Sequence, residues 1–228
     1  MQPVIQHSWD ISENEAIILQ QQLAPKVIQD DHFEGINLVA GVDVAYAKES
    51  DEMIAAVVML NAHTLEIVET ATATHQSTFP YIAGLFSFRE IPVLLEAIAK
   101  LHRKPDLIVC DGQGYAHPRR FGLACHLGVL FDLPTIGCGK TRLLGEHKEV
   151  PSERGQYEFL EDNREVIGAV LRTQTNIKPV YVSVGHRMSL PTAINWILKL
   201  TPKYRLPETT RTADQLVRKT QKEALDLK

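Results

Sequence analysis

The sequence is poor in cysteine. Three cysteines occur in 228 residues, and no two of them are close enough to form a CxxC pair. Their odd number and wide spacing argue against a disulfide framework and against a zinc knuckle, and they favour a reducing compartment. We therefore expect the protein to be cytoplasmic. The three residues are Cys110, Cys125 and Cys138.

Long apolar runs and an excess of positive charge are also missing. No stretch is long enough to span a bilayer and no charged-then-apolar leader opens the chain, so we expect no membrane partner. The formal net charge is −4, from 24 Lys and Arg against 28 Asp and Glu. A nucleic acid would have to be met by local basic residues or through metal ions.

The hydrophobic content, in contrast, is that of a folded chain. Hydrophobic residues make up 44% of the sequence and charged residues 23%, which indicates neither disorder nor low complexity. A chain of 228 residues suits one domain with a sizeable core, and no repeat or linker divides it. We predict a single domain over residues 1–228 and a monomer.

Hydrophobic periodicity predicts an α/β chain. Short polar turns, such as Lys48–Glu52, favour an antiparallel meander for the first three strands, and helices separate the next two. The predicted strands are 38–46, 53–60, 65–74, 107–110 and 135–139. Weaker patterns predict further strands at 164–172 and 178–185. The predicted helices are 12–28, 88–101, 119–131, 191–200 and 212 to the C-terminus.

We therefore predict a central mixed five-stranded sheet, three strands antiparallel and then two parallel, flanked by helices. Right-handed crossovers lay the fourth and fifth strands parallel to the first, which becomes central. Asp43, in the apolar run LVAGVDVAY, would then neighbour Asp111 at the end of the fourth strand. Two facing carboxylates repel unless a cation lies between them, and hard oxygen ligands suggest Mg²⁺ or Mn²⁺. For Asp111, which precedes a glycine, a plain turn role is an equal alternative.

Further candidates lie in the segment PYIAGLFSFRE, residues 80–90. Glu90 is placed to reach the two aspartates, although an acidic residue near a helix start commonly serves the helix dipole. Tyr81 belongs to a loop too apolar for ordinary solvent exposure. Such side chains can insert between bases, or the loop can fold onto the core.

The segment GCGKT, residues 137–141, invites a phosphate-loop interpretation. That motif requires a glycine where Pro134 stands, so the match fails, although Lys140 can still contact a phosphate. His117 could contact a phosphate or position a water, and Arg119 and Arg120 beside it make a local basic patch. Asp214 is by composition only a polar residue near the start of the last helix.

Five segments, in this order, together resemble the endonuclease V family of deoxyinosine-directed DNA repair nucleases. The combination is specific, whereas no single motif is. The segments are GVDVAY (41–46), PYIAGLFSFRE (80–90), CDGQGYAHPRR (110–120), GCGKT (137–141) and PETTRTAD (207–214). Two departures from the family pattern are Ala83 and Thr209, each at a position where proline is usual.

The resemblance implies an RNase H-like fold, in agreement with the predicted strand order. It also implies Mg²⁺-dependent cleavage at the second phosphodiester bond 3′ to deoxyinosine in damaged DNA, leaving 3′-hydroxyl and 5′-phosphate ends. By family position, Asp43 and Asp111 are the principal metal ligands. The other implied site residues are Glu90 and Asp214 in the acidic set, His117 and Lys140 in the active site, Tyr81 in the wedge, and Gly84, Gly112 and Leu143 around the displaced base.

Three alternatives stay open at this point. An inosine-specific ribonuclease of the same family is the nearest, because contacts to a 2′-hydroxyl cannot be identified from the sequence. A nucleotide-binding or kinase-like enzyme would rest on GCGKT. A non-catalytic nucleic-acid binding module would share the scaffold but would not need the acidic set.

Overall fold

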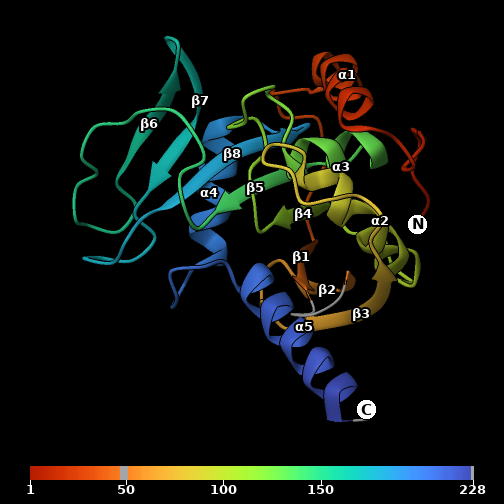
Figure 1. Ribbon diagram of the computed structural model, residues 1–228. Coiled ribbons are helices and arrows are strands. Elements are labelled where there is room, and N and C mark those ends of the chain that lie inside the picture. Colours follow the sequence, from red (N-terminus) through yellow and green to blue (C-terminus); the bar gives the residue numbers. More distant parts are fainter. Residues whose placement is uncertain (47–50, 227–228) are drawn as a thin grey trace.

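The computed structural model describes residues 1–46 and 51–226 (Figure 1). Of the turn predicted at 48–52, residues 48–50 lie outside the described residues. The strands are β1 (Leu38–Tyr46), β2 (Glu52–Asn61), β3 (Ile67–Gln76), β4 (Leu107–Cys110), β5 (Thr135–Gly139), β6 (Tyr157–Asp162), β7 (Glu165–Leu171) and β8 (Val180–His186). The helices are α1 (Glu13–Leu23), the short 3₁₀ turn η1 (Ala24–Lys26), α2 (Phe86–Ala99), α3 (Leu123–Phe131), α4 (Leu190–Leu200) and α5 (Glu208–Asp226).

The described strands form one sheet in the order β3-β2-β1-β4-β5-β8-β7-β6. β1 runs antiparallel to β2 and parallel to β4, and β4 runs parallel to β5, so the predicted mixed α/β architecture is confirmed. The sheet has eight strands rather than five because β8, β7 and β6 continue it beyond β5, each antiparallel to its neighbour. β6 was not predicted, because its sequence YEFLED buries only Leu160 and the strand depends on pairing with β7.

Several helix boundaries differ from the prediction for local reasons. α3 begins at Leu123 rather than at residue 119, because Arg120 takes a left-handed φ of +54° and Gly122 is extended. α5 begins at Glu208, directly after Pro207, which is four residues earlier than predicted. α1 ends at Leu23, where Pro25 leads into the 3₁₀ turn. In the described chain, no helix is both long enough and apolar enough to cross a membrane.

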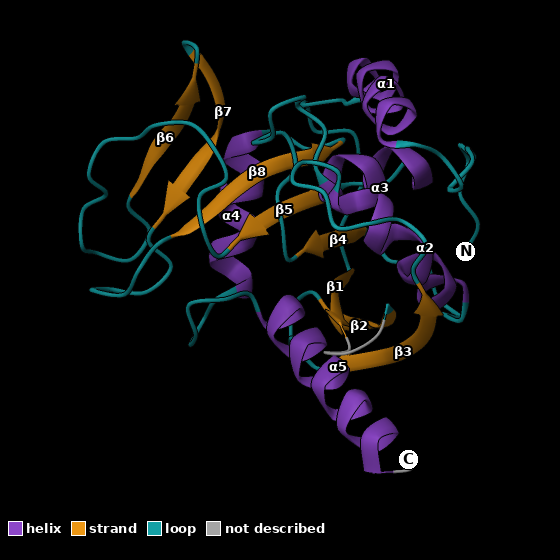
Figure 2. Cartoon of the chain, in the orientation of Figure 1, coloured by secondary structure: helices purple, strands orange, loops and turns teal. Residues whose placement is uncertain are grey.

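Helices cover both faces of the sheet (Figure 2). Ala40 and Val42 of β1 and Ile108 of β4 lie in the core beneath α2 and α3. The alternate residues, such as Val39 and Val109, belong to the core that includes α4. Because side chains alternate along a strand, the odd-numbered positions of β1 and β4 face α4 and α5. Asp43 and, one residue past β4, Asp111 continue this odd-numbered series.

A histidine with no exposed surface lies in the core on the other face of the sheet. His126 of α3 has its Nδ1 3.0 Å from the Ser87 hydroxyl and its Nε2 2.8 Å from Nε2 of His7. Burial, and then the neighbouring His7, hold the pKa of His126 well below its usual 6.5. The folded protein therefore keeps His126 neutral under conditions in which the unfolded chain protonates it.

We expect acid to destabilise the protein partly through His126. The unfolded chain binds more protons at this residue below pH 6.5, so the free energy of unfolding falls as pH drops, by up to about 1.4 kcal/mol per pH unit. Urea unfolding of metal-free protein between pH 7 and pH 5 should show a smaller loss for His126→Asn than for wild type. Val129→Ala, which removes buried methyl groups but no titrating group, should keep the wild-type slope. Parallel curves for wild type and His126→Asn would contradict the assignment.

Candidate active site

Asp43 and Asp111 come together where β1 and β4 lie side by side. Val42 pairs with Cys110 in parallel register, which brings the next residue of each chain to the same edge of the sheet. Burial, and then the charge of Asp111, raise the pKa of Asp43 to about 7. The predicted juxtaposition of the two carboxylates is therefore present, and ionising both is costly without a cation.

Lys140 and Asp214 complete the charged cluster on this face. The Lys140 ammonium, one residue past β5, pairs with Asp111. Burial alone would lower the pKa of Lys140, but the hydrogen bond and charge of Asp111 raise it. Asp214 of α5 adds its charge to the environment of Asp43 and pairs with Arg218 one turn later, at 2.9 Å. Three acidic side chains thus surround one lysine.

Glu90 approaches the same edge from the opposite face of the sheet. It lies in the second turn of α2, so the helix-dipole alternative does not describe its position. Its carboxylate is buried and accepts a 2.6 Å hydrogen bond from the Tyr46 hydroxyl of β1. Burial raises the pKa of Glu90, and Asp43 and Asp111 raise it further.

The donor set fits a hard divalent cation. Among the described residues no three His, Cys, Asp or Glu side chains converge as a ready-made metal cage. Mg²⁺ does not require one, since it keeps several waters and is bound by one or two carboxylates together with substrate phosphates. The half-buried Asp43–Asp111 pair, with the Lys140 ammonium as its counter-charge, meets that requirement.

The loop before α2 has both buried and exposed apolar side chains. Phe79 and Leu85 are buried with Phe88, so the alternative that the loop folds onto the core holds for most of its apolar side chains. Tyr81 is the exception, with 71% of its surface exposed. Its ring meets Phe86 edge-on, with 6.4 Å between the centroids. An exposed aromatic side chain on a loop anchored by buried ones has the form expected of a wedge.

The Gly84 turn in this loop is held by three side chains from distant parts of the chain. Its carbonyl accepts hydrogen bonds from Gln20, His117 and Arg119, at 3.1, 3.0 and 2.6 Å. Gly84 has a φ of +79°, which favours glycine. Nδ1 of His117 also accepts from the Arg119 amide, so both ring nitrogens are engaged. Burial, and then Arg119, lower the pKa of His117 to about 4.

A cavity of about 360 Å³ opens between this loop and the segment after β5. Seven of the ten predicted site residues line it, and Asp43, Glu90 and Asp214 do not. The seven are Tyr81, Gly84, Asp111, Gly112, His117, Lys140 and Leu143. The residues predicted around the displaced base therefore line a cavity, the candidate base pocket, directly beside the charged cluster.

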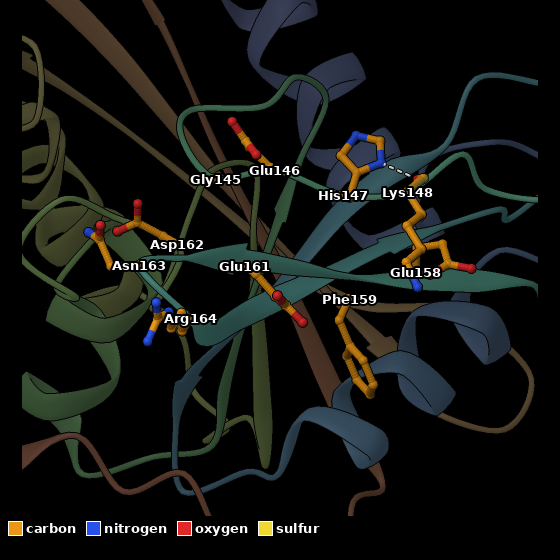
Figure 3. A pocket seen from close by; sticks show the side chains of 10 residues that line it. All are labelled: Gly145, Glu146, His147, Lys148, Glu158, Phe159, Glu161, Asp162, Asn163 and Arg164. Atoms are coloured by element: carbon orange, nitrogen blue, oxygen red, sulfur yellow. Dashed lines mark hydrogen bonds between the residues drawn. The ribbon is translucent and has the colours of Figure 1, made fainter.

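A larger cavity, of about 760 Å³, lies elsewhere, at the hairpin of β6 and β7 (Figure 3). Glu146, Glu158 and Glu161 line it, but they do not point toward one another. None of the ten predicted site residues belongs to its wall. The predicted site residues therefore point to the smaller cavity and not to the larger one.

Sequence reasoning missed the contacts that four residues make in the site, although it had placed one of them, Arg119, in a basic patch. Gln20, Arg119 and Tyr46 act through contacts that span at least 35 residues, for which a single sequence carries no spacing signal. Gln113 donates to the Thr141 carbonyl at 3.0 Å, while its side-chain oxygen is buried without a hydrogen-bond partner in the described residues. Its place within DGQG was the one available signal.

The sheet order defines an RNase H-like α/β protein with an acidic cluster at the carboxyl end of its strand β4, beside the central strand β1. The family model for Endonuclease V matches residues 21–215. The chain belongs to the Endonuclease V family. This assignment also removes the kinase-like alternative, in agreement with the absence of a helix directly after β5 in the described chain.

Individual relatives cover nearly the whole chain. Endonuclease V of Rippkaea orientalis is 55% identical over 205 residues, which is 90% of each chain. The crystal structure of Endonuclease V from Streptomyces avermitilis is 49% identical with a TM-score of 0.92, covering 97% of this chain and 98% of that one. A structure from Ciona intestinalis, 27% identical with a TM-score of 0.83, covers 94% of this chain and all of that one. It holds a 23mer DNA containing an inosine followed by a ribo-adenosine.

Proposed function

We propose that this protein is a DNA repair endonuclease that nicks DNA at the second phosphodiester bond 3′ to deoxyinosine, leaving 3′-hydroxyl and 5′-phosphate ends. The observation that carries the proposal is the pocket beside the Asp43–Asp111 pair, closed on one side by the Tyr81 loop. The Ciona relative bound to inosine-containing DNA supports the same substrate. The monomeric state and the cytoplasmic location stay predictions.

Asp43 and Asp111 would hold Mg²⁺, for which Mn²⁺ can substitute. Bound there, the ion would polarise the scissile phosphate and stabilise the charge that develops on the leaving 3′-oxygen. Lys140 pairs with Asp111. It would be free to contact a phosphate once Asp111 binds the metal ion. Asp214, on the same face as Asp43, is the better candidate to orient the attacking water, since both nitrogens of His117 are already occupied.

Selection of the lesion follows from the pocket and the loop. A base must leave the stack to enter a cavity of about 360 Å³, and a weakly paired base does so at lower cost. The exposed Tyr81 ring would fill the space that the base leaves. His117 and Arg119 hold the carbonyl of Gly84, so their role is to keep this wall of the pocket in place.

Tyr81→Ala is expected to weaken binding to a deoxyinosine duplex by about 5- to 150-fold, which corresponds to the 1–3 kcal/mol typical of one base–aromatic stack. The Mg²⁺-induced shift in melting temperature should stay that of wild type, because Tyr81 packs against Phe86 and supplies no carboxylate to the acidic pair. Fluorescence anisotropy and thermal melting measure the two effects. The matched control is Tyr157→Ala, which removes a different exposed tyrosine, located on β6, and should bind as wild type. Unchanged affinity for Tyr81→Ala would remove the wedge assignment.

Cleavage of deoxyinosine DNA and inosine RNA in parallel, with Mg²⁺, Mn²⁺ or no metal, tests the proposed function. We expect a metal-dependent nick in the DNA at the second bond. The ribo-adenosine that follows inosine in the Ciona complex supports the alternative, an inosine-specific ribonuclease, and faster cleavage of RNA would establish it. Failure to cut either substrate with any metal would leave a non-catalytic binding module.

A further inference from the structure

A second depression adjoins the candidate active site. It measures about 440 Å³ and shares three wall residues, Lys140, Thr141 and Arg142, with the base pocket. Arg205, from the far wall, donates a 2.8 Å hydrogen bond to the carbonyl of Lys140. In Figure 1 the segment after β5 runs from this point toward β6 and β7. The two depressions are therefore neighbours separated only by residues 140–142.

The second depression is strongly cationic in a chain whose net charge is −4. Five basic side chains line it against one carboxylate, that of Glu149. Of the five, Lys140 alone forms an ion pair within residues 1–46 and 51–226, and its partner is Asp111 of the active site. The basic groove, as we name this depression, is defined by Lys140, Arg142, Arg172, Lys178 and Arg205.

Two of these cations are built into the fold without being neutralised. Arg172 donates to the carbonyls of Val150 and Pro151, at 2.8 and 3.0 Å. Arg205 donates to the carbonyls of Lys178 and Pro179, at 2.8 and 2.9 Å. Carbonyl oxygens hold the guanidinium groups in place but carry no net charge. Both arginines thus keep a fixed positive charge at the groove.

The groove also offers aromatic surface. Tyr181 of β8 and His147 line it, and their rings meet edge-on with 6.0 Å between centroids. Arg142 and Lys178 are exposed at the rim, where they are free to reach a ligand. Cationic side chains that follow a backbone, combined with rings on which bases stack, are the usual elements of nucleic-acid grooves.

We propose that the basic groove binds the sugar-phosphate backbone of the substrate beyond the flipped nucleotide and the scissile phosphate. The inference rests on the proposed function, which makes the Lys140 end of the groove a phosphate site. Backbone contacts carry no sequence information. The groove therefore adds affinity equally for damaged and undamaged strands, and it leaves selection of the lesion to the pocket and Tyr81.

The double variant Arg142→Gln/Lys178→Gln tests the groove, because it removes two rim charges and leaves Arg172 and Arg205 in their structural bonds. We expect binding in EDTA to weaken about tenfold or more at 0.1 M salt, for deoxyinosine and undamaged duplexes alike. The slope of log K against log salt should fall in magnitude by about 1.4 to 1.8. Arg103→Gln/Lys104→Gln removes two exposed cations ahead of β4, at the other end of the sheet, and should bind as wild type.

Shortened substrates locate the contact. Removing nucleotides stepwise from the 5′ or the 3′ side of the lesion should, in one of the two series, abolish the difference between wild type and the double variant. A wild-type affinity and salt slope for the double variant would overturn the proposed role of the groove. A difference that survives shortening from both the 5′ and the 3′ side would overturn it as well. If wild-type protein nicks no substrate, the proposed function is wrong. The binding measurements then still test whether the groove contacts the nucleic-acid backbone.

Discussion

Asp43→Asn is expected to abolish nicking, with a loss of at least about 10³-fold. Metal ions contribute several kcal/mol of charge stabilisation to such reactions, and each 1.4 kcal/mol is a factor of ten in rate. Asparagine keeps the size of the side chain but removes the charge that would hold the ion. Single-turnover nicking of a deoxyinosine duplex at saturating enzyme measures the effect without a contribution from binding.

The same substitution is expected to stabilise the metal-free protein above pH 7. The pKa of Asp43 is raised from 3.8 to about 7, so its folded form favours the protonated carboxyl. Its contribution to stability is fully present below pH 3.8 and is lost as pH rises through 7, where the ionised group becomes a cost. Asparagine does not titrate. We expect a gain of about 1 to 3 kcal/mol at pH 8 in EDTA, which shrinks as pH falls.

Magnesium should reverse the order of stability. An ion that binds only the folded state raises the melting temperature of wild type, whereas Asp43→Asn has lost a ligand and should barely respond. Asp30→Asn, at an exposed carboxylate outside the site, is the control and should match wild type in activity and in response to Mg²⁺. Retention of Mg²⁺-dependent nicking within tenfold of wild type by Asp43→Asn would show that Asp43 is no metal ligand.

The part of the site built on strand ends could be predicted, because parallel strands obey strict rules. An acidic residue inside the apolar run of β1 indicated an unusual partner, and the crossover rule placed Asp111 beside it. The family motifs extended this to the pocket, whose wall contains Gly84, Gly112 and Leu143. Local pattern and topology therefore predicted the Asp43–Asp111 pair, whereas the pocket residues and the role of Asp214 were implied only by the family resemblance.

The contacts that rigidify the site could not be predicted in the same way. Gln20 reaches the Gly84 carbonyl across 64 residues, and Tyr46 reaches Glu90 across 44. Such pairs depend on how helices dock on the sheet, which a single sequence does not encode as a spacing. The edge strand β6 was not predicted for a related reason, since it is stabilised by its neighbour β7 and buries only Leu160.

The close approach of α5 to β1 requires a glycine at position 41, which leads to the second large effect. A Cβ atom at Gly41 would lie 2.2 Å from the carbonyl carbon and oxygen of Thr209 and 2.8 Å from its Cα. These are backbone atoms in the first turn of α5, so no side-chain rotation can relieve the overlap. Either the helix or the central strand has to move.

Gly41→Ala is therefore expected to cost at least about 1 to 3 kcal/mol of unfolding free energy, the range for overpacked cores. Asp214 lies on the same helix, five residues beyond Thr209, so it should shift away from Asp43 with α5. A misplacement of about 1 Å can lower a reaction rate about 10²-fold. Urea unfolding and single-turnover nicking measure the two losses. Gly35→Ala is the matched control, because a Cβ there meets nothing within 4 Å.

The two losses separate stability from positioning. If Gly41→Ala nicks at the wild-type rate at a temperature where it is fully folded, α5 serves stability alone and Asp214 has no role in orienting the water. If the rate stays low in the folded variant, the close approach of β1 and α5 is what holds Asp214 over Asp43. A variant as stable as Gly35→Ala would instead mean that α5 tolerates the displacement. Thr209, with Ala83 one of the two departures from the family pattern that the sequence suggests, has a buried hydroxyl that lacks a hydrogen-bond partner in the described chain.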